Sequence, residues 1–182
     1  MPFNHNIHHR RSIRLKGYDY SQAGLYFITI CCNRKGNPLW LPLWLPFGKI
    51  ENKEMILNDA GKMIETEWVA LITRFQNIEL HEYIVMPNHF HGILQIVGGT
   101  VGATTRVAPT KTIGDMMDAF KSITTVEYIR GVKTLGWQPF NGKIWQRNYY
   151  ENIIRDEQAY QNISNYILNN PAKWNEDKFF TS

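Results

Sequence analysis

Two apolar runs, 78–86 and 89–97, are separated by only two residues, Pro87 and Asn88. Both runs are rich in β-branched and aromatic side chains, which favour strands. Proline and asparagine are typical of tight turns, so the two runs should pair directly as an antiparallel hairpin. This hairpin is the strongest constraint that the chain places on its own fold.

The segments around the hairpin alternate between strand-like and helical patterns of apolar residues. They predict a strand at 24–33, a small hairpin at 47–58, a helix at 59–75 capped by Asn58 or Asp59, a helix at 111–133, a strand or extended segment at 143–154, and a helix at 155–170 that ends at Pro171. The order βαββαβ followed by a helix predicts an α+β fold, with a ferredoxin-like or RRM-like antiparallel sheet and helices on one face. The other face of the sheet should then be open to a ligand.

Length and composition bound the class of protein. At 182 residues, 43% hydrophobic and 20% charged, the chain should form one soluble domain over 1–182. The segment PLWLPLWLP at 38–46 is expected to be an extended insertion, because its prolines exclude a helix interior, and 98–110 a flexible loop. No stretch reaches the roughly 20 apolar residues of a membrane span, and Cys31 and Cys32 would point to opposite faces of a strand. A cytoplasmic protein without a membrane partner is expected.

The basic residues at the N-terminus stand apart from the rest of the charge. Arg10, Arg11, Arg14 and Lys16 precede the first acidic residue and equal the whole net charge of +4. A basic arm over 1–17 is typical of a segment that lies along phosphates. A solvated tail has the same composition, so the charge alone leaves both interpretations open.

His89 and His91 are separated by one residue, so in a strand both imidazoles project from the same face. Two imidazoles on one face suit a shared transition-metal ion, with Mn²⁺ more natural than Mg²⁺ and further oxygen ligands required. The same spacing also arises by accident on a half-exposed strand. His81 is a further candidate ligand, although its place near the start of a strand is typical of a surface residue.

In the last predicted helix, Tyr166 and Asn170 are four residues apart and therefore lie on one helical face. A phenol with its ordinary pKa of about 10 is a weak nucleophile unless its target is activated, which a metal-bound phosphate would be. The spacing is equally compatible with a tyrosine that packs its ring on the sheet. Tyr149 and Tyr150 are rival nucleophiles that spacing does not exclude.

Three blocks occur in the order YIVMPNHFHGIL, IWQRNYYENIIRD and YILNNPAKW. Together they resemble the signatures of the single-tyrosine HUH transposases, in particular the REP-associated tyrosine transposases. The resemblance extends from about Tyr18 to Trp174, which is nearly the whole chain. The combination of the histidine pair, the tryptophan-glutamine block and the terminal Tyr-x-x-x-Asn-Pro is highly specific.

The resemblance implies a site and a reaction. A divalent ion, Mg²⁺ or Mn²⁺, would bind His89, His91 and Asn170, and Tyr166 on the C-terminal helix would be the nucleophile. Tyr166 would cut single-stranded DNA beside a hairpin, form a 5′-phosphotyrosine and free a 3′-hydroxyl, and the reverse attack would rejoin strands without ATP. Basic candidates for contacts to the DNA backbone are Arg10, Arg11, Arg14, Lys121, Lys143 and Arg147.

Two other functions are compatible with the residues. A non-catalytic nucleic-acid-binding module of the same fold would bind a hairpin and leave it uncut. A metal-dependent hydrolase of small molecules would need an acid or base beside the histidines and a closed pocket, and no carboxylate near the histidines in the sequence is spaced for that role. The sequence also leaves open whether Tyr166 serves its own subunit's ion or that of a partner in a homodimer.

Overall fold

The computed structural model describes residues 18–33, 45–98 and 111–180. The predicted basic arm at 1–17, with Arg10, Arg11 and Arg14, lies outside the described residues. So do most of the insertion predicted at 38–46 and of the loop predicted at 98–110.

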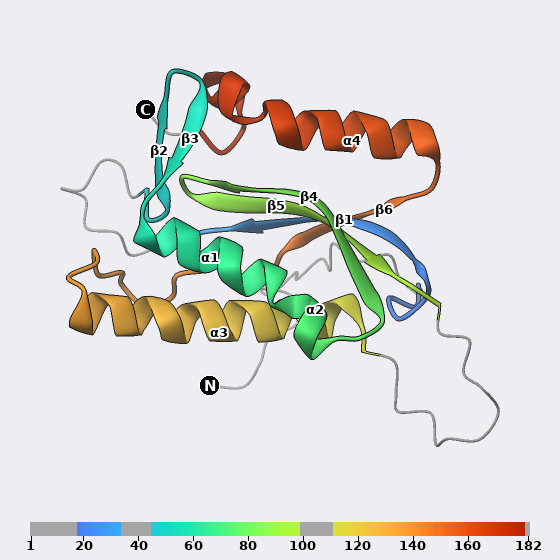
Figure 1. Ribbon diagram of the computed structural model, residues 1–182, viewed down its shortest axis with the longest axis horizontal. Coiled ribbons are helices and arrows are strands. Elements are labelled where there is room, and N and C mark those ends of the chain that lie inside the picture. Colours follow the sequence, from blue (N-terminus) through green and yellow to red (C-terminus); the bar gives the residue numbers. More distant parts are fainter. Residues whose placement is uncertain (1–17, 34–44, 99–110, 181–182) are drawn as a thin grey trace, which may run out of the picture.

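Four antiparallel strands form the central sheet, in the order β4-β5-β1-β6 (Figure 1). They are β1 (Gly24–Cys31), β4 (Ile78–Met86), β5 (His89–Ile96) and β6 (Tyr150–Ile154). The predicted central hairpin is confirmed, because β4 and β5 pair with each other from Met86 opposite His89 onward. The α+β class with an antiparallel four-stranded sheet is confirmed as well.

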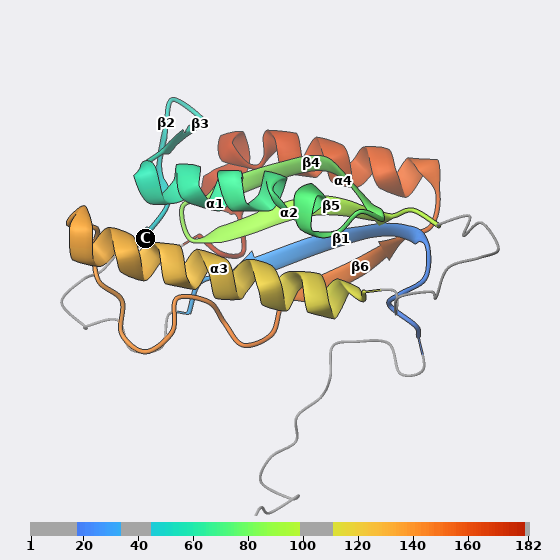
Figure 2. The ribbon, with the colours of Figure 1, turned by 60° about the horizontal axis from the view of Figure 1, so that its bottom comes forward.

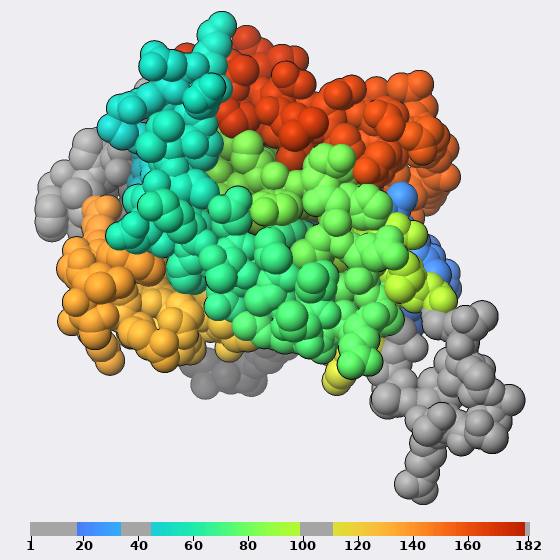
Figure 3. All heavy atoms as spheres, viewed as in Figure 1, coloured from blue at the N-terminus to red at the C-terminus, as the bar shows by residue number. Residues whose placement is uncertain are grey.

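A separate two-stranded sheet consists of β2 (Gly48–Glu51) and β3 (Glu54–Leu57). Its turn residues Asn52 and Lys53 have φ values of 52° and 67°. Two consecutive residues with positive φ are typical of a two-residue hairpin turn, because that turn matches the twist of the strands. In the space-filling view, this hairpin stands beside the C-terminal segment (Figure 3).

Helices cover both faces of the sheet. They are α1 (Asp59–Val69), α2 (Leu71–Arg74), α3 (Ile113–Thr134), α4 (Glu157–Asn169) and the 3₁₀ helix η1 (Pro171–Glu176). The helices α1 and α3 lie on one face and α4 on the other (Figures 1 and 2). The N-termini of α1, α3 and α4 are capped by the side chains of Asn58, Thr112 and Asp156, which accept hydrogen bonds from backbone N–H groups of the first turns.

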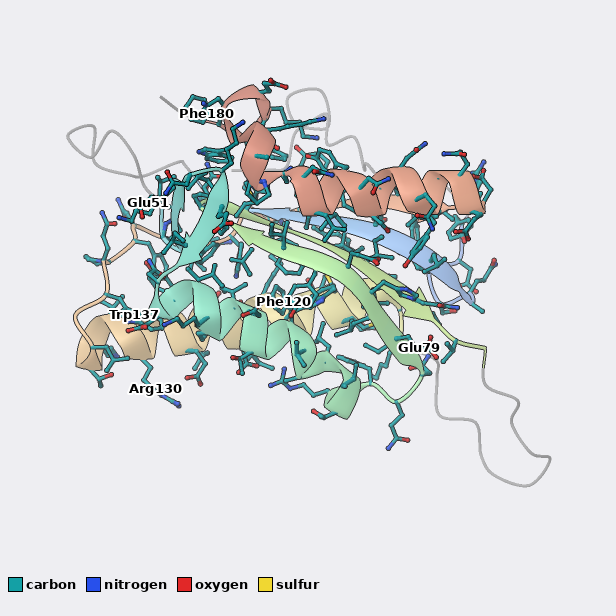
Figure 4. The ribbon with its side chains drawn as sticks, turned by 45° about the horizontal axis from the view of Figure 1, so that its top comes forward. Glu51, Glu79, Phe120, Arg130, Trp137 and Phe180 are labelled. Carbon is teal, nitrogen blue, oxygen red and sulfur yellow. The ribbon has the colours of Figure 1, made fainter. Side chains whose placement is uncertain are left out.

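Three expectations need correction. The helix predicted at 59–75 is divided at Ala70 into α1 and α2, a break that neither glycine nor proline marks in the sequence. The strand or extended segment predicted at 143–154 is a regular strand only in β6, and before it Trp145 makes an isolated bridge to Cys32 and donates its indole N–H to Thr124. The sheet face expected to be open is largely covered by α4 and η1 (Figure 4).

The main core lies between the sheet and the pair α1 and α3. Phe90 on β5 packs between Trp68 of α1 and Phe120 of α3, with ring centroids 4.6 and 5.6 Å away. Phe120 points from α3 toward the sheet in Figure 4. Gly92, two residues along the same strand, has no room for a side chain, because a Cβ there would lie 2.7 Å from the Trp68 ring. This close approach fixes the position of β5 and therefore of its histidines.

A smaller apolar cluster attaches α4 to the opposite face. Ile93 of β5, Ile154 of β6 and Ile167 of α4 are buried there together. Because side chains alternate along a strand, residues 89, 91 and 93 face α4 while 90, 92 and 94 face the main core. In the described part of the chain, no helix is long and apolar enough to cross a membrane.

Candidate metal and nucleophile site

The two histidines of β5 lie on the face of the sheet that α4 covers. Their Nε2 atoms are 3.0 Å apart, and the rings are 0% and 1% exposed for His89 and His91. Two nitrogens bound at about 2.1 Å in adjacent positions of an octahedral shell would be about 3 Å apart. The pair is therefore spaced as two ligands of one ion would be.

The outer nitrogen of each ring is held by a neighbour. His89 Nδ1 lies 2.9 Å from Asn88 Oδ1, and His91 Nδ1 lies 2.8 Å from Thr29 Oγ1. The Asn88 amide nitrogen donates to the Phe179 carbonyl, so its Oδ1 accepts and the proton of neutral His89 sits on Nδ1. That tautomer leaves the lone pair of His89 Nε2 aimed at the shared position. A metal would select the same tautomer of His91, with Nδ1–H donating to Thr29.

Tyr166 reaches this pair from α4. Its hydroxyl lies 3.2 Å from His91 Nε2 and 3.3 Å from Asp177 Oδ2. Asn170, one helical turn further on, donates its amide N–H to the same Asp177 oxygen at 3.1 Å. The structure therefore brings together the four residues that the sequence singled out and adds Asp177, which sequence reasoning missed.

Asp177 follows η1, where the backbone leaves the 3₁₀ helix. Its other oxygen, Oδ1, accepts the Phe179 backbone N–H at 2.6 Å, which fixes the orientation of the carboxylate. Ligand atoms of His89, His91 and Asp177 lie within 4.8 Å of one another. No periodic pattern in the sequence identifies Asp177 as a site residue, because its position relative to the histidines depends on the path of the backbone after Pro171.

The donor set fits a divalent cation. Asn170 is 3% exposed, and its Oδ1 has no hydrogen-bond partner among the described residues, while its Nδ2 is engaged by Asp177. A buried amide oxygen without a partner is costly unless a ligand satisfies it. Two imidazole nitrogens with a carboxylate and an amide oxygen are a mixed set that suits Mn²⁺, and Mg²⁺ with added waters.

The charge states are compatible with metal binding. Burial, followed by the neighbouring His89, holds the pKa of His91 well below its usual 6.5, so the ring is neutral at physiological pH. Burial and the Asp177 carboxylate raise the pKa of Tyr166 to about 12. The phenol is therefore protonated at rest, with its O–H available to a carboxylate acceptor.

Aromatic rings enclose the histidines. Phe27 of β1 stacks on His91 at 5.3 Å and meets the Tyr166 ring edge-on at 6.1 Å. Trp174 and Phe179 lie over His89, with ring centroids 5.9 and 4.7 Å from it. The C-terminal segment thus covers His89.

Other residues named from the sequence lie elsewhere. His81 is half-buried and contacts Tyr160 and Gln95, outside the His89, His91 and Asp177 group. Tyr149 is buried in the main core, on the side of α1 and α3. Of the three tyrosines considered, Tyr166 has its hydroxyl 3.2 Å from His91 Nε2.

The described basic candidates gather near α3. Lys121 donates from Nζ to the Arg147 carbonyl at 2.7 Å. Burial lowers the pKa of Lys121, and the charge of Lys143 lowers it further. Lys121 is on α3, whereas Lys143 and Arg147 lie in the segment between α3 and β6. Their contact with DNA stays a prediction.

A His-x-His pair on a central strand that faces a tyrosine on a C-terminal helix defines the HUH class of tyrosine nucleases. The chain belongs to the IS200-like transposases within that class, because residues 50–170 match the family described as "Transposase IS200 like". This family assignment confirms the resemblance seen in the sequence blocks.

Two further comparisons show what the chain is similar to in sequence and in fold. An "Uncharacterized protein" of Haemophilus influenzae is 38% identical over 192 aligned positions, which cover 98% of this chain and 97% of that protein. The solved structure of a REP-associated tyrosine transposase bound to a REP hairpin is 18% identical, covers 91% of this chain and 76% of that chain, and superposes with a TM-score of 0.55. The structural likeness shows a shared fold.

Proposed function

We propose that this protein cleaves and rejoins single-stranded DNA beside a hairpin, with Tyr166 as the nucleophile. The observation that carries the proposal is the 3.2 Å separation between the Tyr166 hydroxyl and His91 Nε2 within one chain. A phenol packed on the sheet for structural reasons alone would have no need to meet a buried imidazole pair. Because both groups belong to the same chain, one subunit supplies a complete site.

The metal-binding part of the site consists of His89, His91 and Asn170, joined by Asp177. A divalent ion held there, Mg²⁺ or Mn²⁺, would supply a positive charge that polarises the phosphate. Thr29 and Asn88 keep the imidazoles in the tautomers that present Nε2 inward.

Proton transfer during attack is the role of Asp177. As the Tyr166 oxygen forms a bond to phosphorus, the phenol proton passes to Asp177 Oδ2, which lies 3.3 Å away. The bond between phosphorus and the 3′-oxygen of the preceding nucleotide breaks, and that oxygen leaves as a hydroxyl after taking up a proton from water. The products are a 5′-phosphotyrosine and a free 3′-hydroxyl, and the reverse steps rejoin strands.

The substrate must be unpaired at the cleavage point, because a duplex could not bring one phosphate between α4 and the sheet. Trp174 and Phe179 cover His89, so the segment after α4 has to shift when a phosphate enters. The REP hairpin bound by the structural relative makes hairpins with single-stranded flanks the first substrates to test. Arg10, Arg11, Arg14, Lys121, Lys143 and Arg147 are the proposed contacts to the DNA backbone.

The test is formation of a covalent protein–DNA adduct. Hairpin oligonucleotides with a labelled single-stranded flank are incubated with the protein and Mn²⁺ or Mg²⁺, and adducts are detected on denaturing gels. We expect an adduct with wild-type protein, none with Tyr166→Phe and none in EDTA. Tyr150→Phe is the matched control, since Tyr150 is a rival phenol, 47% exposed, on β6. Hairpin binding without any adduct would instead support the non-catalytic binding module.

A further inference from the structure

A groove of about 330 Å³ runs between α4 and η1, directly beside the nucleophile. Tyr166, Asn170 and Asp177 belong to its lining, so a molecule in the groove adjoins the phenol of Tyr166. The rest of the lining comes from exposed polar side chains: Asn162, Asn165 and Asn169 on α4, and Lys173 and Glu176 on η1. The two elements are the uppermost layer of the molecule in Figure 4.

The α4 side of the groove is built from amides rather than from charged residues. Asn162, Asn165 and Asn169 follow one another at spacings of three and four, so they form a single stripe along the helix. Asparagine is a poor helix former, because its side chain competes for backbone hydrogen bonds. Three of them on an exposed helical face therefore do not serve helix stability.

The hydrogen bonds within the stripe leave groups for a ligand. Asn162 Oδ1 accepts from Gln158, which leaves its amide N–H groups as donors. Asn169 Nδ2 donates to the Asn165 carbonyl, which leaves its Oδ1 as an acceptor. One wall thus offers a donor at Asn162 and an acceptor at Asn169, and the other wall carries a cationic Lys173 and an anionic Glu176.

We infer that this groove binds one unpaired base of the DNA strand, adjacent to the phosphate that Tyr166 attacks, and reads its identity. Asparagine amides recognise base edges by donating and accepting hydrogen bonds, as adenine recognition shows, and a carboxylate accepts from the cytosine amino group. The volume lies at the low end of the range for small-ligand sites, which suits a single nucleotide. This inference rests on the proposed function, because it places the base relative to the cleaved phosphate.

The experiment uses a pool of hairpin oligonucleotides with a randomised single-stranded flank, incubated with the full-length protein and Mn²⁺. Covalent adducts are captured and sequenced, which gives the base preference at each position around the cleaved phosphate. We expect wild-type protein to favour one base at a position adjoining that phosphate. In Asn165→Ala and Asn169→Ala that preference should fall by about fivefold or more, while preferences at other positions persist.

The matched control is Gln161→Ala. Gln161 is exposed on α4, bonds to Glu157 and does not line the groove. The Gln161→Ala variant should therefore have the same base preference as wild-type protein. Alanine is the better helix former, so a lost preference in the asparagine variants does not come from unfolding of α4. Circular dichroism confirms this for each variant.

A second readout separates failure of the groove from failure of the reaction. The same pool is selected by non-covalent retention on Tyr166→Phe protein, with and without Asn165→Ala, and positions are counted from the foot of the hairpin. One outcome is that wild-type protein forms no adducts while Asn165→Ala still removes a base preference in this selection. That result would support base binding in the groove and would reject the proposed cleavage reaction. The proposal that the groove reads a base would be overturned if both asparagine variants kept the wild-type base preference. It would also be overturned if wild-type protein showed no base preference in the flank.

Discussion

The Tyr166 hydroxyl lies 3.2 Å from His91 Nε2, although 75 positions separate the two residues in the sequence. The contact forms because α4 crosses the sheet face to which β5 directs its histidines. Ile167, the residue after Tyr166, is buried against Ile93, two residues after His91 on the same face. An apolar contact therefore holds Tyr166 and the imidazole pair together.

This contact predicts that one subunit carries out cleavage with its own tyrosine. Tyr166→Phe and His91→Gln variants, each inactive alone, should stay inactive when mixed, because neither chain then holds a complete site. Adduct formation by the mixture over a range of protein concentrations is the measurement. Recovery of adduct in the mixture would show that α4 serves a partner's site.

The carboxylate of Asp177 should control the ionisation of the phenol. Burial and this negative charge raise the Tyr166 pKa to about 12. In Asp177→Asn the charge is gone, so the Tyr166 pKa should fall from about 12 toward the ordinary value of 10. The measurement is absorbance titration of phenolate in metal-free protein, with Tyr166→Phe subtracted. A pKa that stays unchanged in Asp177→Asn would contradict the electrostatic contact.

The hydroxyl of Thr29 should tune metal affinity without touching the ion. Thr29→Val keeps the side-chain shape but removes the Oγ1 that lies 2.8 Å from His91 Nδ1. Loss of such an outer partner typically weakens metal binding by about 10- to 100-fold. Calorimetric titration with Mn²⁺ measures the change, and Thr66→Val, an exposed site on α1 where the hydroxyl bonds to Lys62, is the matched control. Equal Mn²⁺ affinity in Thr29→Val and wild-type protein would argue against this role.

Gly92 should be intolerant of any side chain. A Cβ at this position would lie 2.7 Å from Trp68 Cζ2, so Gly92→Ala has to displace β5 or α1. Overpacking of this kind costs about 1–3 kcal/mol of unfolding free energy. Urea denaturation gives the value, with Gly98→Ala as the control, since a Cβ there meets Ala23 at an ordinary 3.6 Å. If the two variants had similar free energies of unfolding, the Trp68 ring would be able to move away from the new Cβ without loss of stability.

Local sequence patterns determined several features of the fold and of the site. The two-residue connection between the central strands required a hairpin, and the alternation of a strand placed His89 and His91 on one face. The period of a helix placed Tyr166 above Asn170 in the same way. These features depend on neighbours one to four positions apart, so the chain encodes them before any tertiary contact forms.

The tertiary structure alone decided how the site is completed. Asp177 contacts Tyr166 and Asn170 only because the chain turns back after Pro171, and Thr29 meets His91 across 62 positions of sequence. The covering of the supposedly open face by Trp174 and Phe179 depends on the same turn. Such contacts join residues through packing rather than through periodicity, and packing is a property of the whole folded chain.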